Sequence, residues 1–343
     1  MNLKIFLYGF ILSVIVSCSD DEPEIVSADD QAPLIELEFS HPPIALPGTQ
    51  ALFAADIPYD AYAETTFDIF LPVSAAPTGL VIFIHGGGFT GGDKAFIYTD
   101  NHENEVFELL NNGIAVATIN YRLLSPGDRD GVLKSLNDSK RALQYIRYIH
   151  NELNIDQDNI VLFGSSAGAS TALWLATNDD LSVPNSLDPV QRESTRVKGV
   201  ALHATQSSLD IEKRWLGEVF AEFDSSLEDL IQVYGADSFY SFYGVSSREA
   251  YESPEIEAYR RQVDMLTLLS SDDPEIWVTN TGGHNEAPMT SSSFNHHPFH
   301  AREIKAFADA AGVANVTTYG NPILYADTDD EDYVAFLRRK ISE

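Results

Sequence analysis

The chain has 343 residues, 44% of them hydrophobic, and a formal net charge of −31 at pH 7. This length fits one large α/β domain or two small ones, and the apolar content is ordinary for a protein with a buried core. The large negative charge argues against nucleic acid as a partner, because it would repel phosphates. We interpret the acidity as a strongly solvated surface rather than as a site for a cationic partner.

The N-terminus has the pattern of an export signal. Lys4 precedes an apolar run at 5–16, which is short for a membrane-spanning helix and typical of a secretory signal. Cys18 is the only cysteine, so no intrachain disulfide can form. Residues 15–18, Ile-Val-Ser-Cys, resemble a bacterial lipobox, which implies a signal peptide at 1–17 and lipidation of Cys18. An ordinary signal peptide with an incidental cysteine is the alternative.

Residues 18–47 are acidic and contain several prolines, without the periodicity of a helix or a strand. We expect this segment to tether a domain of residues 48–343 away from the membrane. The acidic run at 19–22 is similar to the export tag of surface lipoproteins in some Gram-negative bacteria, which implies an outer-membrane location.

In the domain, short apolar or alternating runs predict strands at 66–72, 79–84, 114–120, 160–163, 197–203, 275–280 and 315–319. Helices are predicted at 104–111, 136–153, 169–176, 298–311 and 333–341. Residues 205–272, rich in aromatic and acidic side chains, interrupt this alternation, and we expect a helical cap there. The alternation of strands and helices predicts a mostly parallel sheet with helices on both faces.

The segment 164–168, Gly-Ser-Ser-Ala-Gly, fits G-x-S-x-G between a predicted strand and a predicted helix. In that setting the central Ser166 occupies a strained turn that exposes its hydroxyl, and a Cβ on either glycine would collide with neighbouring backbone. A second motif, His-Gly-Gly-Gly at 85–88, follows an earlier apolar strand. We expect backbone N–H groups of Gly87, Gly88 and Ala167 to form an oxyanion hole. We expect His85 to anchor the glycine loop rather than to act in catalysis.

These two motifs, with Asn-Tyr-Arg-Leu at 120–123, Asp138 and Asn-Ile-Asp at 154–156, resemble the α/β-hydrolase fold. Within it they are similar to the carboxylesterase and hormone-sensitive-lipase-like group. The resemblance covers about residues 65–180. It implies ester hydrolysis through an acyl-enzyme on Ser166, with no metal and no organic cofactor.

The C-terminal half departs from that pattern. The group's histidine follows the last strand, but the loop at 320–327 has no histidine, and none occurs after His300. A serine without a general base is a weak nucleophile at neutral pH. The candidates are therefore the histidines of the loop after 275–280 and of the helix start that follows it. Among His284, His296, His297 and His300, we favour His297 and then His284 as the base.

For the acid of the triad we favour Glu286, two residues after His284, and then Asp210, which would keep the chain order serine, acid, histidine. Asp327, Asp329 and Asp330 fit a solvated acidic turn better. Two other functions stay open: a binding lipoprotein that has lost its base, and a metal hydrolase using His296, His297 and His300. No ligand motif such as H-E-x-x-H supports the second.

Overall fold

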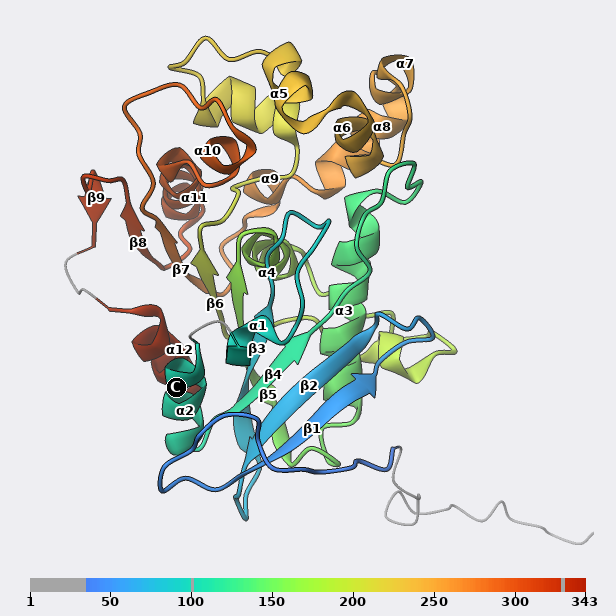
Figure 1. Ribbon diagram of the computed structural model, residues 1–343, viewed down its shortest axis with the longest axis vertical. Helices are drawn as coiled ribbons and strands as arrows, with labels where there is room; N and C mark the ends of the chain where they lie inside the picture. Colours follow the sequence, from blue (N-terminus) through green and yellow to red (C-terminus); the bar gives the residue numbers. More distant parts are fainter. Residues whose placement is uncertain (1–34, 100–101, 328–330) are drawn as a thin grey trace, which may run out of the picture. The chain divides into compact units, whose positions relative to one another are not determined.

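The computed structural model describes residues 35–99, 102–327 and 331–343 (Figure 1). They belong to one compact unit, Ile35–Glu343. The predicted signal peptide and Cys18 lie outside the described residues. Within the described ranges, no helix combines the length and the apolar character that crossing a membrane requires.

The centre of the fold is a single sheet whose order is β1-β2-β4-β3-β5-β6-β7-β8-β9. The strands are β1 (Ala51–Pro58), β2 (Thr66–Pro72), β3 (Thr78–Ile84), β4 (Ala115–Ile119), β5 (Ile155–Ser165), β6 (Gly199–His203), β7 (Glu275–Asn280), β8 (Asn315–Tyr319) and β9 (Tyr325–Ala326). The strands from β4 to β8 in this order run parallel, and antiparallel strands close both edges. The predicted α/β-hydrolase architecture is therefore present.

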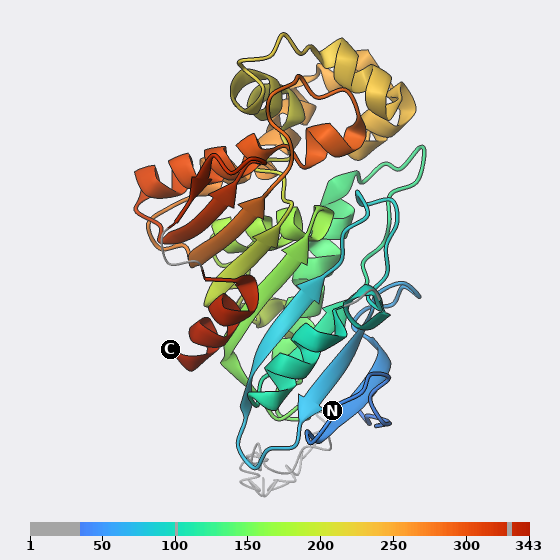
Figure 2. The same ribbon diagram turned by 60° about the vertical axis from the view of Figure 1, so that its left-hand side comes forward.

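Helices cover both faces of the sheet (Figures 1 and 2). One hydrophobic cluster packs α3 (Val132–Tyr148), α4 (Ala167–Thr177), α9 (Met265–Leu268) and α11 (Pro298–Ala311) against one face. The other cluster packs α1 (Phe96–Thr99), α2 (Glu103–Asn111) and α12 (Tyr333–Ser342) against the opposite face. Strand β3 is buried throughout, with Leu80, Ile82 and Ile84 in the first cluster and Val81 and Phe83 in the second. Burial on both faces explains why this strand is apolar without alternation.

The expected cap lies between β6 and β7. It contains a π-helix at Ile211–Val219, followed by α5 (Leu227–Tyr234), α6 (Ala236–Phe242), α7 (Arg248–Tyr251) and α8 (Pro254–Gln262). Its aromatic side chains form a third cluster, which Phe294 and Phe299 join from outside the cap. Figure 2 shows these helices above the arrowheads of the central strands, at the edge of the sheet where the parallel strands end.

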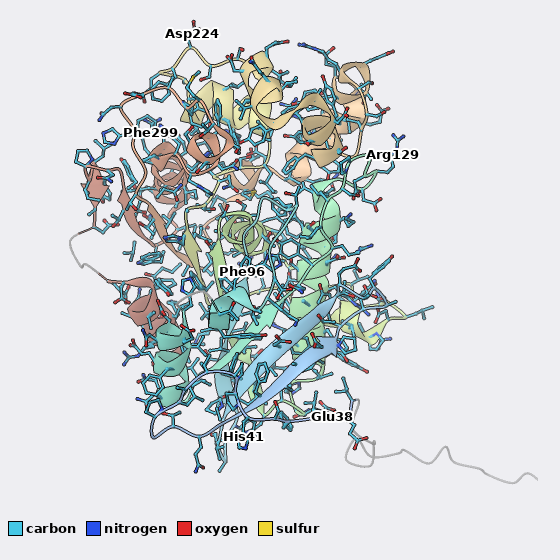
Figure 3. The ribbon with its side chains drawn as sticks, viewed as in Figure 1. Glu38, His41, Phe96, Arg129, Asp224 and Phe299 are labelled. Atoms are coloured by element: carbon cyan, nitrogen blue, oxygen red, sulfur yellow. The ribbon has the colours of Figure 1, made fainter. Side chains whose placement is uncertain are left out.

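Part of the segment assigned to the tether belongs to the domain. Ser40 forms a bridge with Phe53 of β1, with N–H to carbonyl distances of 2.8 and 3.2 Å. Ile35 and Leu37 pack against one core cluster, and apolar side chains at 44 and 46 pack against the other. Figure 3, which labels Glu38 and His41, shows this stretch running beside β1. The described residues from Ile35 onward are therefore held by the sheet, which the proline content of the segment did not indicate.

Candidate active site

Ser166 occupies the sharp turn between β5 and α4, as the motif predicts. Its backbone has φ 52° and ψ −119°, a conformation that non-glycine residues rarely adopt. Its N–H donates to the carbonyl of His203 at the end of β6, over 2.9 Å. A Cβ on Gly164 would lie 2.3 Å from the carbonyl oxygen of Gly168, and one on Gly168 would lie 1.9 Å from that of Ile84. A side chain at 164 or 168 would clash with backbone atoms, so both positions require glycine. The close packing that glycine allows holds the strained turn in place.

The glycine loop lies against this turn. A Cβ on Gly86 would come within 3.1 Å of the Ser166 Cβ. Gly87 and Gly88 have φ angles of 109° and 61°, which favour glycine. The N–H groups of Gly87 and Gly88, and that of Ala167 at the start of α4, have no acceptor among the residues described. They are free to stabilise a developing oxyanion, which is the role predicted for them.

His85 fastens the glycine loop to the sheet. Its side chain is 1% exposed and stacks on the Tyr121 ring at 4.4 Å between centroids. Its Nδ1 lies 2.7 Å from the carbonyl oxygen of Gly86, and the Tyr121 hydroxyl donates to the His85 carbonyl over 2.9 Å. Burial lowers the pKa of the His85 imidazole. This environment fits the anchoring role expected from the sequence.

The histidine that meets the nucleophile is His296. Its Nε2 lies 2.9 Å from the Ser166 Oγ, a normal hydrogen-bond distance. His296 is the C-terminal cap of α10 (Ser291–Asn295), in the long connection from β7 to α11. The contact with Ser166 is thus made by His296, one of the four candidate histidines, and not by His297 or His284, the two that we favoured.

His297 points the other way. It caps the N-terminus of α11, where its own Nδ1 accepts the N–H of Phe299 over 3.3 Å. Its ring packs among Phe220, Phe223 and Phe299 and is 3% exposed. Burial first, and Arg302 second, lower the pKa of His297 to about 4. His297 does stand at the start of α11, directly before Pro298, but its ring lies in the aromatic cluster of the cap and makes no hydrogen bond to Ser166.

The other two candidate histidines also lack contact with Ser166. The ring of His284 lies 6.5 Å from the Phe299 ring, and its buried Nδ1 has no hydrogen-bond partner among the described residues. His300 is fully buried between Ser207 and the carbonyl of Phe294. Burial lowers the pKa of His300 to about 3. These partners leave His300 with a structural role under the cap.

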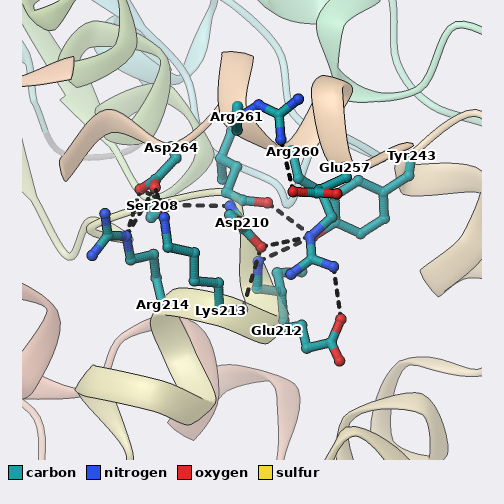
Figure 4. A network of polar contacts seen from close by, with 12 residues as sticks. Ser208, Asp210, Glu212, Lys213, Arg214, Tyr243, Glu257, Arg260, Arg261 and Asp264 are labelled. Atoms are coloured by element: carbon teal, nitrogen blue, oxygen red, sulfur yellow. Dashed lines mark hydrogen bonds and ion pairs between the residues drawn. The ribbon is translucent and has the colours of Figure 1, made fainter. Parts of the chain in front are cut away.

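Neither predicted acid reaches His296. Glu286 is exposed and makes no hydrogen bond or ion pair with a described residue. Asp210 caps the π-helix through the Lys213 N–H and accepts from Arg260 Nε over 2.7 Å (Figure 4). Asp327 accepts the Thr317 N–H and the Tyr325 hydroxyl, so it closes the β8–β9 hairpin. Asp329 and Asp330 lie outside the described residues.

The second nitrogen of the His296 ring faces a hydroxyl instead. The Oγ of Ser292 lies 3.4 Å from His296 Nδ1. In the ranges 35–99, 102–327 and 331–343, no carboxylate contacts this ring. Burial first, and the neighbouring His203 second, lower the pKa of His296. A lowered pKa favours the neutral imidazole, the form that can accept a proton, and no described carboxylate lies beside the ring to stabilise its protonated form.

Three side chains that the sequence analysis did not single out hold His296 in place. The buried Asn280 donates to the carbonyls of Thr205 and His297 over 2.9 and 3.1 Å. Gln206 accepts from the Ser170 hydroxyl of α4 over 2.7 Å and donates to the Asn295 carbonyl over 2.9 Å. From the cap, the Tyr234 hydroxyl donates to Asn295 Oδ1 over 2.7 Å. A lone Asn, Gln or Tyr carries no motif, so only the folded chain identifies these contacts.

Two cavities meet at Ser166, and both include Gly88, Ser291 and Asn295 in their walls. The aromatic cavity, of about 550 Å³, lies under the cap. Its apolar wall consists of Phe89, Leu124, Leu209, Ile211, Trp215, Tyr234, Phe239 and Phe242. The histidine cavity, of about 430 Å³, is lined on its other side by Phe96, His102, Ser292 and His296. An ester bound at Ser166 has room for one of its halves in each cavity.

Comparison with known proteins places this arrangement in a family. A family model named BD-FAE matches residues 67–255, which is more than half of the chain. The chain belongs to the BD-FAE family. The matched range contains the glycine loop, the turn at Ser166 and most of the cap, but it ends before His296.

Among relatives, the chain is 33% identical to the fumonisin B1 esterase of Sphingopyxis macrogoltabida over 129 residues, which are 34% of this chain and 23% of that protein. It is 32% identical to acetylcholinesterase-1 of Trittame loki over 108 residues, 28% of this chain and 18% of that one. The chain thus spans less than a quarter of the length of either relative.

Solved structures share the fold. A truncated carbohydrate esterase from gut microbiota superposes with a TM-score of 0.58 at 17% identity, covering 85% of this chain and 96% of that one. Esterase B from Lactobacillus rhamnosis gives a TM-score of 0.53 at 18% identity, covering 80% of this chain and 76% of that one. These likenesses confirm the α/β-hydrolase fold.

The described residues contain no group of three or more His, Cys, Asp or Glu side chains arranged to hold a metal ion. His296, His297 and His300, the cluster considered for a metal from the sequence, contact three different sets of partners.

Asp210 forms an ion pair with Arg260, and its substitution tests whether its role is structural or catalytic. We expect Asp210→Asn to lower the free energy of unfolding by about 2 kcal/mol, because a charged hydrogen bond to Arg260 is weakened. The rate at which a fluorophosphonate probe labels Ser166 should change by less than about twofold, whereas loss of a triad carboxylate costs about 10⁴-fold. Chemical denaturation and timed labelling measure the two quantities. A folded variant that no longer labels would restore Asp210 as the acid.

Proposed function

We propose that this chain is a serine esterase that hydrolyses carboxylic esters through an acyl-enzyme on Ser166. The observation that carries the proposal is the 2.9 Å contact between Ser166 Oγ and His296 Nε2 at the strained turn. A serine becomes a competent nucleophile when a base accepts its proton, and this contact supplies the base. Membership of the BD-FAE family and the fumonisin B1 esterase relative support ester hydrolysis.

The proposed steps follow from this geometry. Ser166 Oγ attacks the ester carbonyl carbon while His296 Nε2 takes the hydroxyl proton. The carbonyl oxygen becomes an oxyanion facing the N–H groups of Gly87, Gly88 and Ala167. One such donor stabilises the transition state by about 3–4 kcal/mol. His296 then gives the proton to the leaving alcohol oxygen, and a water molecule, activated by the same nitrogen, releases the acid from Ser166.

The two cavities assign the two halves of the substrate. The leaving oxygen must lie within hydrogen-bond reach of His296 Nε2 to receive its proton. His296 lines the histidine cavity and not the aromatic cavity. We therefore place the alcohol in the histidine cavity and the acyl group in the aromatic cavity under the cap. The histidine cavity offers both aromatic faces, from Phe83 and Phe96, and hydrogen-bonding groups, from His102 and Ser292. A sugar has apolar C–H faces as well as hydroxyls, so we propose an alcohol such as a fragment of a polysaccharide.

We further propose that the enzyme is anchored in the bacterial cell envelope through a lipid on Cys18. The support is the sequence alone: the apolar run at 5–16, the lipobox-like residues 15–18 and the acidic run after them. A location on the outer membrane would suit an esterase that acts on polymer fragments outside the cell.

The alternative of a binding lipoprotein depended on the missing C-terminal histidine. The 2.9 Å contact between Ser166 Oγ and His296 Nε2 supports the esterase over the binding lipoprotein, because it offers the serine a base from another part of the chain. The labelling experiment that follows decides between the two.

Mass spectrometry after incubation with a fluorophosphonate probe tests the nucleophile and its base. We expect a stoichiometric adduct that Ser166→Ala abolishes and that His296→Ala slows by about three orders of magnitude or more. His297→Asn is the matched control, since asparagine is a good helix N-cap and this ring does not touch Ser166. It should label within about threefold of the wild-type rate. No adduct on folded wild-type protein would instead support the binding lipoprotein.

Two ester series test the assignment of the cavities. Ser238→Trp adds bulk to the wall of the aromatic cavity, and Phe96→Ala removes bulk from the histidine cavity. We expect Ser238→Trp to lower kcat/KM for long acyl chains relative to acetyl by about tenfold, a typical effect of lost pocket volume. Phe96→Ala should change the ranking of alcohols in an acetyl series and leave the acyl ranking unaltered. The reverse pattern would exchange the two cavities.

Metabolic labelling tests the anchor. In a Gram-negative host, the full chain should incorporate radioactive palmitate and fractionate with the outer membrane, because a lipidated cysteine inserts its acyl chains into the bilayer. Cys18→Ala should lose the label and leave the membrane fraction. Equal fractionation of both variants without any lipid label would show that Cys18 is incidental to an ordinary signal peptide.

A further inference from the structure

The base of a serine hydrolase is normally oriented by a third group, most often a buried carboxylate. In the described ranges of this chain, that third contact comes from the Ser292 hydroxyl, 3.4 Å from His296 Nδ1. The two predicted carboxylates are occupied elsewhere or exposed. The neighbours of the His296 ring therefore decide its orientation and its tautomer.

Ser292 and His296 lie one helical turn apart in α10. The His296 N–H donates to the Ser292 carbonyl over 3.0 Å, so the same turn positions both side chains. A capping box between Thr290 and Ser293 fixes the start of this helix, and the Tyr234 hydroxyl holds Asn295 near its end. The base and the hydroxyl beside it are therefore carried by one short element with both ends secured.

The contact also determines the tautomer. Ser166 can donate its proton only to an unprotonated Nε2, so the neutral ring must carry its hydrogen on Nδ1. That N–H then donates to the Ser292 Oγ. A hydroxyl acceptor favours the productive tautomer, but it adds no negative charge to balance the protonated ring.

The described titratable groups around His296 also supply no negative charge to its ring. Burial first, and His203 at the end of β6 second, lower the pKa of His296. Burial first, and His102 second, lower the pKa of His203. Glu105 lies 3.7 Å from His102 rather than beside the base. His300, next along α11, is held neutral by burial. Apart from burial, the described group that lowers the pKa of His296 is one imidazole, that of His203.

We propose that Ser292 is the positioning residue of this site, and that its hydroxyl replaces the carboxylate of the usual triad in a chain from Ser166 through His296 to Ser292. This inference rests on the proposed esterase function and deepens it. It assigns a role to a residue in a short helix that no motif of the chain contains.

The test is the rate of fluorophosphonate labelling of Ser166 against pH, on the full folded domain. Since only the neutral imidazole accepts a proton, the wild-type rate should rise with pH and reach half of its plateau below pH 6.5, the usual histidine pKa. Ser292→Ala should lower the plateau rate by about three- to tenfold, the worth of one neutral hydrogen bond. Ser292→Thr, which keeps the hydroxyl, should stay within about twofold of wild type.

Ser292→Asp separates positioning from a merely structural role. A carboxylate at this place should raise the pKa of His296, so the half-plateau point should move to higher pH by about one unit, and the plateau rate should exceed that of Ser292→Ala. Ser246→Asp, an exposed cap serine outside both cavities, is the matched charge control and should leave the profile unchanged. If Ser292 only stabilised α10, aspartate would be as harmful as alanine and would not shift the profile.

Different results would overturn the positioning role of Ser292 and the esterase proposal. Labelling of wild type at a rate and pH profile that Ser292→Ala and Ser292→Asp both reproduce would overturn the positioning role and leave the esterase proposal intact. Absence of labelling in folded wild type would overturn the esterase proposal and, with it, this inference.

Discussion

The contact between Ser166 and His296 joins residues 130 positions apart in the sequence, and the esterase mechanism that we propose depends on it. One partner is fixed by backbone strain: Ser166 has positive φ because Gly164 and Gly168 let α4 approach β3 and β5 within distances that exclude a Cβ. The other partner is fixed by side chains, chiefly Asn280 and Gln206, which tie the connection from β7 to the end of β6 and to α4. Ser166, which a strained turn holds in place, thus faces His296, whose position depends on hydrogen bonds between side chains and backbone.

The sequence was most informative where local rules and tertiary structure agree. The strands and helices that it predicted are present with ends shifted by a few residues, because their apolar runs are buried in the two core clusters. Strand β1 was missed because its residues lie at the edge of the sheet with a mixed burial pattern. The short helices α1 and α10 were missed because a single turn carries too little periodicity to be recognised.

The nucleophile and the base illustrate the limit of motif analysis. Ser166 and the glycine loop were identified because a strained turn and a close backbone approach demand glycine at fixed spacing. The histidine that contacts Ser166 was among the four candidates but was not the favoured one, because a histidine obeys no such backbone rule. His296 and His297 are neighbours in the sequence, yet one caps the end of α10 and the other the start of α11, so their rings face opposite sides. The two rings therefore have different neighbours: His296 contacts Ser166, and His297 packs against Phe220 and Phe223.

The family model covers the residues that motifs identify and ends before the histidine that no motif identifies. The BD-FAE match at 67–255 includes Ser166 and the glycine loop, whereas His296 lies beyond it. The base is carried by α10, and a helix of five residues is not stable alone. Its position depends on Tyr234 from the cap and on Asn280 from the sheet. The cap therefore has two roles: its helices enclose the aromatic cavity, and its Tyr234 supports, through Asn295, the helix that presents His296 to Ser166.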